Sequence, residues 1–171
     1  MLKAISNIIL TFLRFFWEKG KKILLKNITA AASTGKIYIE YRKTKRTTMS
    51  GVPYSEGVLR VVDKDGSIIW QRAARSGGFG KGDLPDGEYK AVWFTWTQAK
   101  GMVQFGVGWL LSLLPQFKTD RTQICIHLDQ PPRGSEACIV FDAADKADAE
   151  ASGKMFESLL AKYQEIEMDV R

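Results

Sequence analysis

The chain has 171 residues, of which 45% are hydrophobic and 26% charged, as expected for one folded soluble domain with a short appendage. Its two cysteines are too few for a disulfide scaffold. The net charge of +6 is uneven, because residues 1–26 carry six bases against one acid and residues 142–171 carry eight acids against four bases. A basic balance confined to one end is not the footprint of a nucleic-acid-binding domain, so no nucleic-acid partner is expected.

Residues 1–33 predict a basic amphipathic helix followed by a linker of small residues. Apolar side chains recur at helical spacing from Ile5 to Phe16. The longest uncharged run, Ala4 to Leu13, is about half of the roughly 20 residues that a bilayer span needs. Three interpretations stay open: a helix on a membrane surface or partner protein, a helix packed on its own domain, and a targeting or signal segment.

From residue 34 to residue 171 the pattern predicts one domain that is mainly β, with flanking helices. Apolar and polar residues alternate in several short runs that are separated by turn residues. Asp65-Gly66 supplies the turn of a β-hairpin, and Leu84 to Gly87 form a second turn. The strands expected before residue 100 cover residues 36–41, 57–62, 67–73 and 88–96.

Two stretches are open to more than one interpretation. Residues 42–49 are basic and rich in threonine, which predicts either a solvated loop or a patch that binds phosphate or another polyanion. Residues 101–114 are apolar and contain three glycines. They predict either a short helix packed on the sheet or a mobile lid over a substrate site, with the glycines as hinges.

The last thirty residues predict a helix and a closing strand. Residues 142–150 are acidic and rich in alanine, which suits a helix N-terminus. Apolar residues from Phe156 to Tyr163 continue one helical face, and a period of two from Ile166 to Val170 predicts the strand.

The residues best suited to chemistry lie between Arg121 and Phe141. This stretch holds His127, the only histidine, and both cysteines, Cys125 and Cys138. Residues 124–128 and 138–141 predict two strands joined by a polar loop. Imidazole can take the proton of a thiol near neutral pH, so one interpretation is a Cys–His dyad for nucleophilic catalysis.

Other interpretations of these residues stay open. Each cysteine can be a small buried hydrophobe, and the two can form a disulfide if the strands are adjacent and the compartment is oxidising. The loop before Cys138 can direct backbone N–H groups inward as an oxyanion hole, and Ser135 can hydrogen-bond the imidazole or a substrate carboxylate. One histidine and two cysteines without a Cys-x-x-Cys motif are too few to predict a metal site, and no cofactor is expected.

The order of motifs resembles a known family. Ile126-His127, a loop, and then residues 135–140 (Ser-Glu-Ala-Cys-Ile-Val) resemble the active-site signature of L,D-transpeptidase-like (YkuD-like) catalytic domains. The nearest pattern is the short-loop branch found in type VI secretion effectors and phage-encoded relatives. Upstream, the family's Asp-Gly turn, Ser-Gly segment and Leu-Pro-x-Gly-x-Tyr run are matched at 63–66, 76–77 and 84–89. The resemblance covers about residues 57–170.

The resemblance implies an L,D-transpeptidase-like β-sandwich or barrel in residues 34–171, with roles for particular residues. Cys138 would be the nucleophile and His127 the general base, while Ser135 matches the small hydroxyl residue before the cysteine. The substrate-binding residues would be Arg121, Arg133 and Gly134. Ala137 stands where the family has glycine, and alanine would be strained there if the backbone must adopt a positive φ.

The implied reaction is attack of the Cys138 thiolate on an amide of a peptidoglycan stem peptide, between an L-centre and a terminal D-residue. Water would then give L,D-carboxypeptidase activity, and an amine would give transpeptidation or exchange. Such an enzyme would act in the bacterial periplasm or cell envelope after delivery or secretion. The alternative is a non-catalytic binding or structural module on the same fold, for example a phage or secretion-apparatus component.

Overall fold

The computed structural model describes residues 36–132 and 134–171. The helix predicted in residues 1–33 and the candidate residue Arg133 therefore lie outside the described residues. The larger of two compact units spans residues 37–63 and 67–171 and contains all the strands and the helix described below. None of the helices in the described residues is both long enough and apolar enough to cross a membrane.

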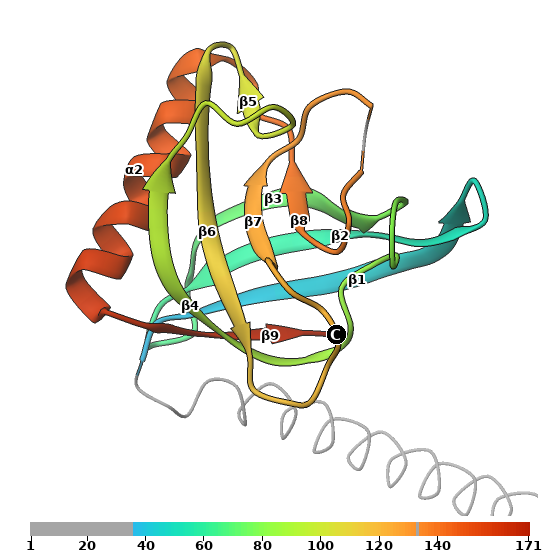
Figure 1. Ribbon diagram of the computed structural model, residues 1–171. Coiled ribbons are helices and arrows are strands. Elements are labelled where there is room, and N and C mark those ends of the chain that lie inside the picture. Colours follow the sequence, from blue (N-terminus) through green and yellow to red (C-terminus); the bar gives the residue numbers. More distant parts are fainter. Residues whose placement is uncertain (1–35, 133) are drawn as a thin grey trace, which may run out of the picture. The chain divides into compact units, whose positions relative to one another are not determined.

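The described residues form a mainly β fold, as the sequence predicts (Figure 1). The strands are β1 (Tyr38–Met49), β2 (Val52–Val62), β3 (Ile68–Gly77), β4 (Gly87–Trp96), β5 (Val103–Gln104), β6 (Val107–Pro115), β7 (Cys125–Leu128), β8 (Ile139–Phe141) and β9 (Ile166–Val170). They form one sheet in the order β4-β9-β1-β2-β3-β8-β7-β6-β5. Because β4 also pairs with β6, eight strands close into a barrel and β5 is attached to β6 as a short extra strand.

Two pairs of strands are parallel, β1 with β9 and β7 with β8. A parallel pair cannot be joined by a tight hairpin, because the chain must return to the end at which the first strand began. Residues 129–138 make that return between β7 and β8. The beginnings of β7 and β8 therefore lie side by side (Figure 1).

The helix α2 (Lys146–Tyr163) covers one side of the barrel next to β4 and β6 (Figure 1). It begins four residues later than the acidic run predicts, because the Asp145 side chain caps the helix by accepting a hydrogen bond from the Asp148 N–H at 2.8 Å. Phe156 is fully buried and packs against Trp70 and Trp109, with ring centroids 5.4 Å apart in both pairs. The closing strand predicted at 166–170 is confirmed as β9.

Two predictions of local structure are wrong. The basic stretch 42–49 is not a loop but the second half of β1, which pairs with β2 up to the Met49–Val52 register. Residues 101–114 are not a helix but the β5–β6 hairpin, which turns at Gly106 with a φ of 76°. Trp109, Leu111 and Leu113 are buried at a period of two, and this alternation defines a strand.

Candidate active site

The thiols and the imidazole meet where β7 and β8 run side by side. The register places Ile126 beside Ile139 and His127 beside Val140, so one step back brings Cys125 next to Cys138. The two Sγ atoms are 3.2 Å apart, and both cysteines are free thiols. Ligand atoms of Cys125, His127 and Cys138 all lie within 4.8 Å of one another. The two members of the predicted dyad are therefore neighbours, and Cys125 joins them.

The backbone fixes the orientation of the His127 ring. Its Nδ1 lies 2.7 Å from the Leu128 carbonyl oxygen. A carbonyl can only accept a hydrogen bond, so Nδ1 carries a proton and Nε2 is the nitrogen that remains to exchange one. His127 is only 6% exposed, and the part that is exposed lines a cavity.

The two thiols differ in their affinity for a proton. The hydrogen bond from Cys125 holds the pKa of Cys138 well below its usual value, and His127 lowers it further, although burial opposes both effects. The same hydrogen bond, together with burial, raises the pKa of Cys125. The proton therefore stays on Cys125, and Cys138 is the better nucleophile of the two.

The site opens into a cavity of about 700 Å³, which is large enough for the end of a short peptide. His127 and Cys138 both line it. The remaining lining residues come from 79–81, 100–102, 120–123, 130–132 and 134–136. The tip of the β5–β6 hairpin thus forms one wall of the cavity, although it is a strand pair and not the predicted helix.

Ser135 supports the loop that carries Cys138, and its polar atoms bond to the backbone of Cys138 and Gly77. Its hydroxyl donates to the Cys138 carbonyl at 2.5 Å and accepts from the Gly77 N–H at 3.3 Å. The N–H of Ser135 donates to the Gly77 carbonyl at 2.9 Å, and the N–H of Gly134 donates to Asp129 Oδ1 at 3.4 Å. These two amides are engaged within the protein, which leaves the amides of residues 136–138 as the candidates in this loop for an oxyanion hole.

Ala137, the residue before Cys138, adopts the positive φ that the family resemblance made critical. Ala137 is 2% exposed and has a φ of 104°. This region of φ is natural for glycine and costs a residue with a Cβ about 1–3 kcal/mol. Alanine at position 137 is therefore held in a strained conformation directly beside Cys138.

The two described residues of the expected substrate-binding set have structural partners. The Arg121 guanidinium donates to the carbonyl oxygens of Lys81 and Gly82 at 2.7 and 3.1 Å, so it ties one cavity wall to another. Gly134 also has a positive φ, and a Cβ there would lie 2.7 Å from the Gly77 carbonyl oxygen. Both residues line the cavity, yet the contacts they make are with the protein itself.

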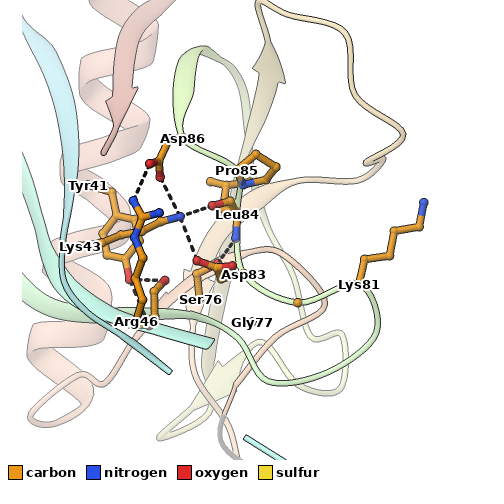
Figure 2. Close-up of polar contacts among 12 residues, drawn as sticks. Tyr41, Lys43, Arg46, Ser76, Gly77, Lys81, Asp83, Leu84, Pro85 and Asp86 are labelled. Carbon is orange, nitrogen blue, oxygen red and sulfur yellow. Dashed lines mark hydrogen bonds and ion pairs between the residues drawn. The ribbon is translucent and has the colours of Figure 1, made fainter. Parts of the chain in front are cut away.

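Sequence reasoning missed the ion pairs that hold the wall formed by residues 79–81. The Lys43 side chain is 2% exposed, and its Nζ lies 2.9 Å from Asp83 and 3.0 Å from Asp86. It also donates to the Leu84 carbonyl (Figure 2). The Leu84 N–H donates in turn to Ser76 Oγ at 2.9 Å. Asp83 and Asp86, on either side of Leu84-Pro85, were the signal in the sequence for these ion pairs, because two acids can neutralise the charge of a basic strand.

A second missed cluster holds the loop after β7. Asp129 is 1% exposed and pairs with Arg75, which also pairs with Asp142. Gln104 from the β5–β6 hairpin donates to the Asp129 carbonyl, and it donates to Asp142 Oδ1 at 3.0 Å. Three segments far apart in the sequence are thus joined, and no local pattern in the sequence predicts that meeting.

These observations define the class of structure. It is a closed, mainly β barrel with two thiols and one imidazole clustered at a cavity. Comparisons with protein-family models, with curated proteins and with solved structures found no match. The resemblance to L,D-transpeptidase-like domains therefore stays a prediction from the sequence.

Proposed function

We propose that this protein is a cysteine-dependent acyltransferase or hydrolase that modifies L,D bonds of peptidoglycan stem peptides. The observation that carries the proposal is the meeting of His127 and Cys138 at the wall of a cavity large enough for a peptide end. A thiol with a lowered pKa beside an oriented imidazole is the arrangement that nucleophilic catalysis requires.

Cys138 and His127 carry out different steps of the proposed reaction. His127 Nε2 takes the thiol proton of Cys138, and Cys138 Sγ attacks the amide carbonyl carbon. The C–N bond then breaks, and the imidazolium returns that proton to the leaving amine. The product is a thioester on Cys138. Water activated by His127 hydrolyses it in the L,D-carboxypeptidase outcome, whereas a second amine completes transpeptidation or exchange.

The substrate class rests on the sequence motifs around His127 and Cys138, together with one feature of the cavity. Its charged lining residues include Lys81, Lys100 and Arg121 against Asp120 and Glu136. The surplus of positive charge favours a ligand that ends in a carboxylate, as a stem peptide does. Action in the periplasm or cell envelope, and an anchoring role of residues 1–33 on a membrane or partner, belong to the same proposal.

The test is incubation of the full chain with muropeptide tetrapeptides, followed by mass spectrometry. We expect loss of terminal D-alanine, and dimers or exchanged products if an amine is the acceptor. Cys138→Ala should abolish the product, and Lys154→Ala, on the exposed face of α2, should retain it. No product with the unmodified chain, or the same product with Cys138→Ala, would refute the proposal.

One observation favours a second candidate, a non-catalytic binding or structural module. The strained Ala137 lies beside the nucleophile, where the geometry of an oxyanion hole would be set. A module that binds without reacting would retain muropeptides in equilibrium dialysis with equal affinity in the unmodified chain and in Cys138→Ala. Turnover by the unmodified chain alone would exclude it.

A further inference from the structure

We infer that Cys125, His127 and Cys138 form a binding site for a thiophilic divalent cation such as Zn²⁺. These are the only two cysteines and the only histidine of the chain, and the fold brings all three together. Two thiolates and one imidazole are a ligand set that zinc accepts, with water or substrate in the fourth position. This inference does not depend on the proposed function.

The distances suit a cation after a small adjustment. Zinc–sulfur bonds of about 2.3 Å in a tetrahedral site place the two sulfur atoms about 3.8 Å apart. The Sγ atoms of Cys125 and Cys138 are 3.2 Å apart, so they would have to separate by about half an ångström. Cys138 precedes the first residue of β8, where the chain is not yet part of the sheet ladder and can make that shift.

His127 is already oriented as a metal ligand. Histidines that bind metals usually donate the other ring N–H to a carbonyl or carboxylate, which fixes the tautomer and the ring plane. The contact of Nδ1 with the Leu128 carbonyl at 2.7 Å is such an outer-shell partner. It leaves Nε2, the usual zinc ligand in proteins, to face the cation.

The fourth position would open toward the cavity, because His127 and Cys138 both line it. On binding, two Zn–S bonds and one Zn–N bond form, and the thiol protons are released to solvent. A thiolate bound to zinc is not available to attack a carbonyl. If the proposed function holds, zinc and the acyl-enzyme therefore compete for Cys138.

The test uses Co²⁺ as the spectroscopic probe on the reduced full chain, without substrate. We expect one equivalent to produce thiolate-to-cobalt charge-transfer absorption, and one equivalent of Zn²⁺ to displace it. Cys125→Ser and Cys138→Ser should each weaken the band, and His127→Ala should lower the affinity at least about 100-fold, since outer-shell partners alone contribute about 10–100-fold. Asp120→Asn and Glu136→Gln, which change carboxylates at the same cavity, should leave the band and the affinity unchanged.

Absence of the charge-transfer band, or an affinity that depends on Asp120 or Glu136 and not on His127, would overturn the inference. A second measurement separates it from the proposed function. Iodoacetamide labelling of Cys138 should slow at least tenfold at one equivalent of Zn²⁺ and recover with a chelator. A chain inactive on muropeptides that still shows the cobalt spectrum would refute the proposed function and uphold the metal site. Labelling at an unchanged rate with bound zinc would refute the competition.

Discussion

Ala137 carries the clearest strain in the described part of the chain. We expect Ala137→Gly to raise the free energy of unfolding by up to about 1 kcal/mol, because relief of the positive φ exceeds the entropy that glycine loses on folding. Urea denaturation measures the change. Ala74→Gly, at a buried position in β3, should change stability in the opposite direction. A loss of stability in Ala137→Gly would show that the Cβ contributes packing that outweighs the strain.

The two cysteines give a second prediction at the scale of single residues. The lowered pKa of Cys138 means that its thiolate persists below the usual thiol range of about pH 8.5, and that reactivity falls only as the pH drops through the folded value. Iodoacetamide should therefore label Cys138 at pH 6–7 faster than it labels glutathione. Cys125, with a raised pKa and 5% exposure, should label more slowly than Cys138. Peptide mapping by mass spectrometry distinguishes the two sites.

Some residues of the site could be predicted from the sequence and others could not. His127, Cys138 and the demand on Ala137 could be predicted, because each follows from residue type and position in a short motif. The roles of Ser135 and Arg121 could not, because their partners include backbone groups some forty to sixty residues away. A hydrogen bond with a backbone group does not depend on the side chain of the residue that provides that group, so it leaves no trace in the sequence.

At the scale of elements, β1 shows how one buried charge can determine the structure of a loop. Lys43→Ala should lower the free energy of unfolding by about 1–3 kcal/mol, because it leaves the partly exposed Asp83 without its cationic partner. Lys45→Ala, two residues along the same strand, should cost less than about 1 kcal/mol, because its pair with Glu56 at 3.7 Å is exposed. Thermal or urea denaturation of both variants gives the comparison.

Equal losses in the two variants would show that Lys43 acts as a surface residue. The Lys43 change should also disturb the cavity wall at residues 79–81, which a rise in the KM for muropeptides would report if the proposed function holds.

The elements that sequence reasoning found are those with strong local signals. The hairpin around Asp65-Gly66, the strand after Gly87, α2 and β9 all follow from turn chemistry or periodicity. The errors at 42–49 and 101–114 have a common cause. In β1 the inward-facing Lys43 breaks the apolar alternation, and in β6 the half-buried Leu110 and the exposed Leu114 hide it. Strand prediction from alternation assumes that apolar residues face inward and polar residues outward. A buried charge and leucines that are half-buried or exposed both violate that assumption.

At the scale of the whole molecule, Glu40 on β1 is paired with β2 and with the residue that follows β9. It is 3% exposed and pairs with Arg42, Arg60 and Arg171 at 2.9, 3.4 and 2.8 Å. Burial would raise its pKa, but hydrogen bonds to Arg171 and Arg42 prevail and lower it. The stability that this carboxylate contributes is therefore present above the unfolded-state pKa of about 4.3 and is lost as the pH falls through the lower folded value.

We expect Glu40→Gln to be less stable than the unmodified chain at pH 7 and to lose less stability between pH 5 and pH 3. Chemical denaturation across that range measures both effects. Glu165→Gln, which removes an exposed carboxylate paired with Lys90, is the matched control. It should leave the loss of stability between pH 5 and pH 3 unchanged. Parallel pH curves for Glu40→Gln and the unmodified chain would show that Glu40 is protonated at the same pH in both states.

The family resemblance left a β-sandwich and a barrel both open, and the order in which the barrel closes could not be predicted, because periodicity identifies strands without saying which strands pair. The position of β9 between β4 and β1 has a consequence for synthesis. β1 is made more than a hundred residues before its parallel partner, and β4 also waits for β9. On the ribosome, β1 can pair with β2 early, but the gap in the barrel persists until residues 166–170 have left the exit tunnel. The nascent chain therefore exposes two unpaired strand edges until then, which makes β9 the last step in burying them.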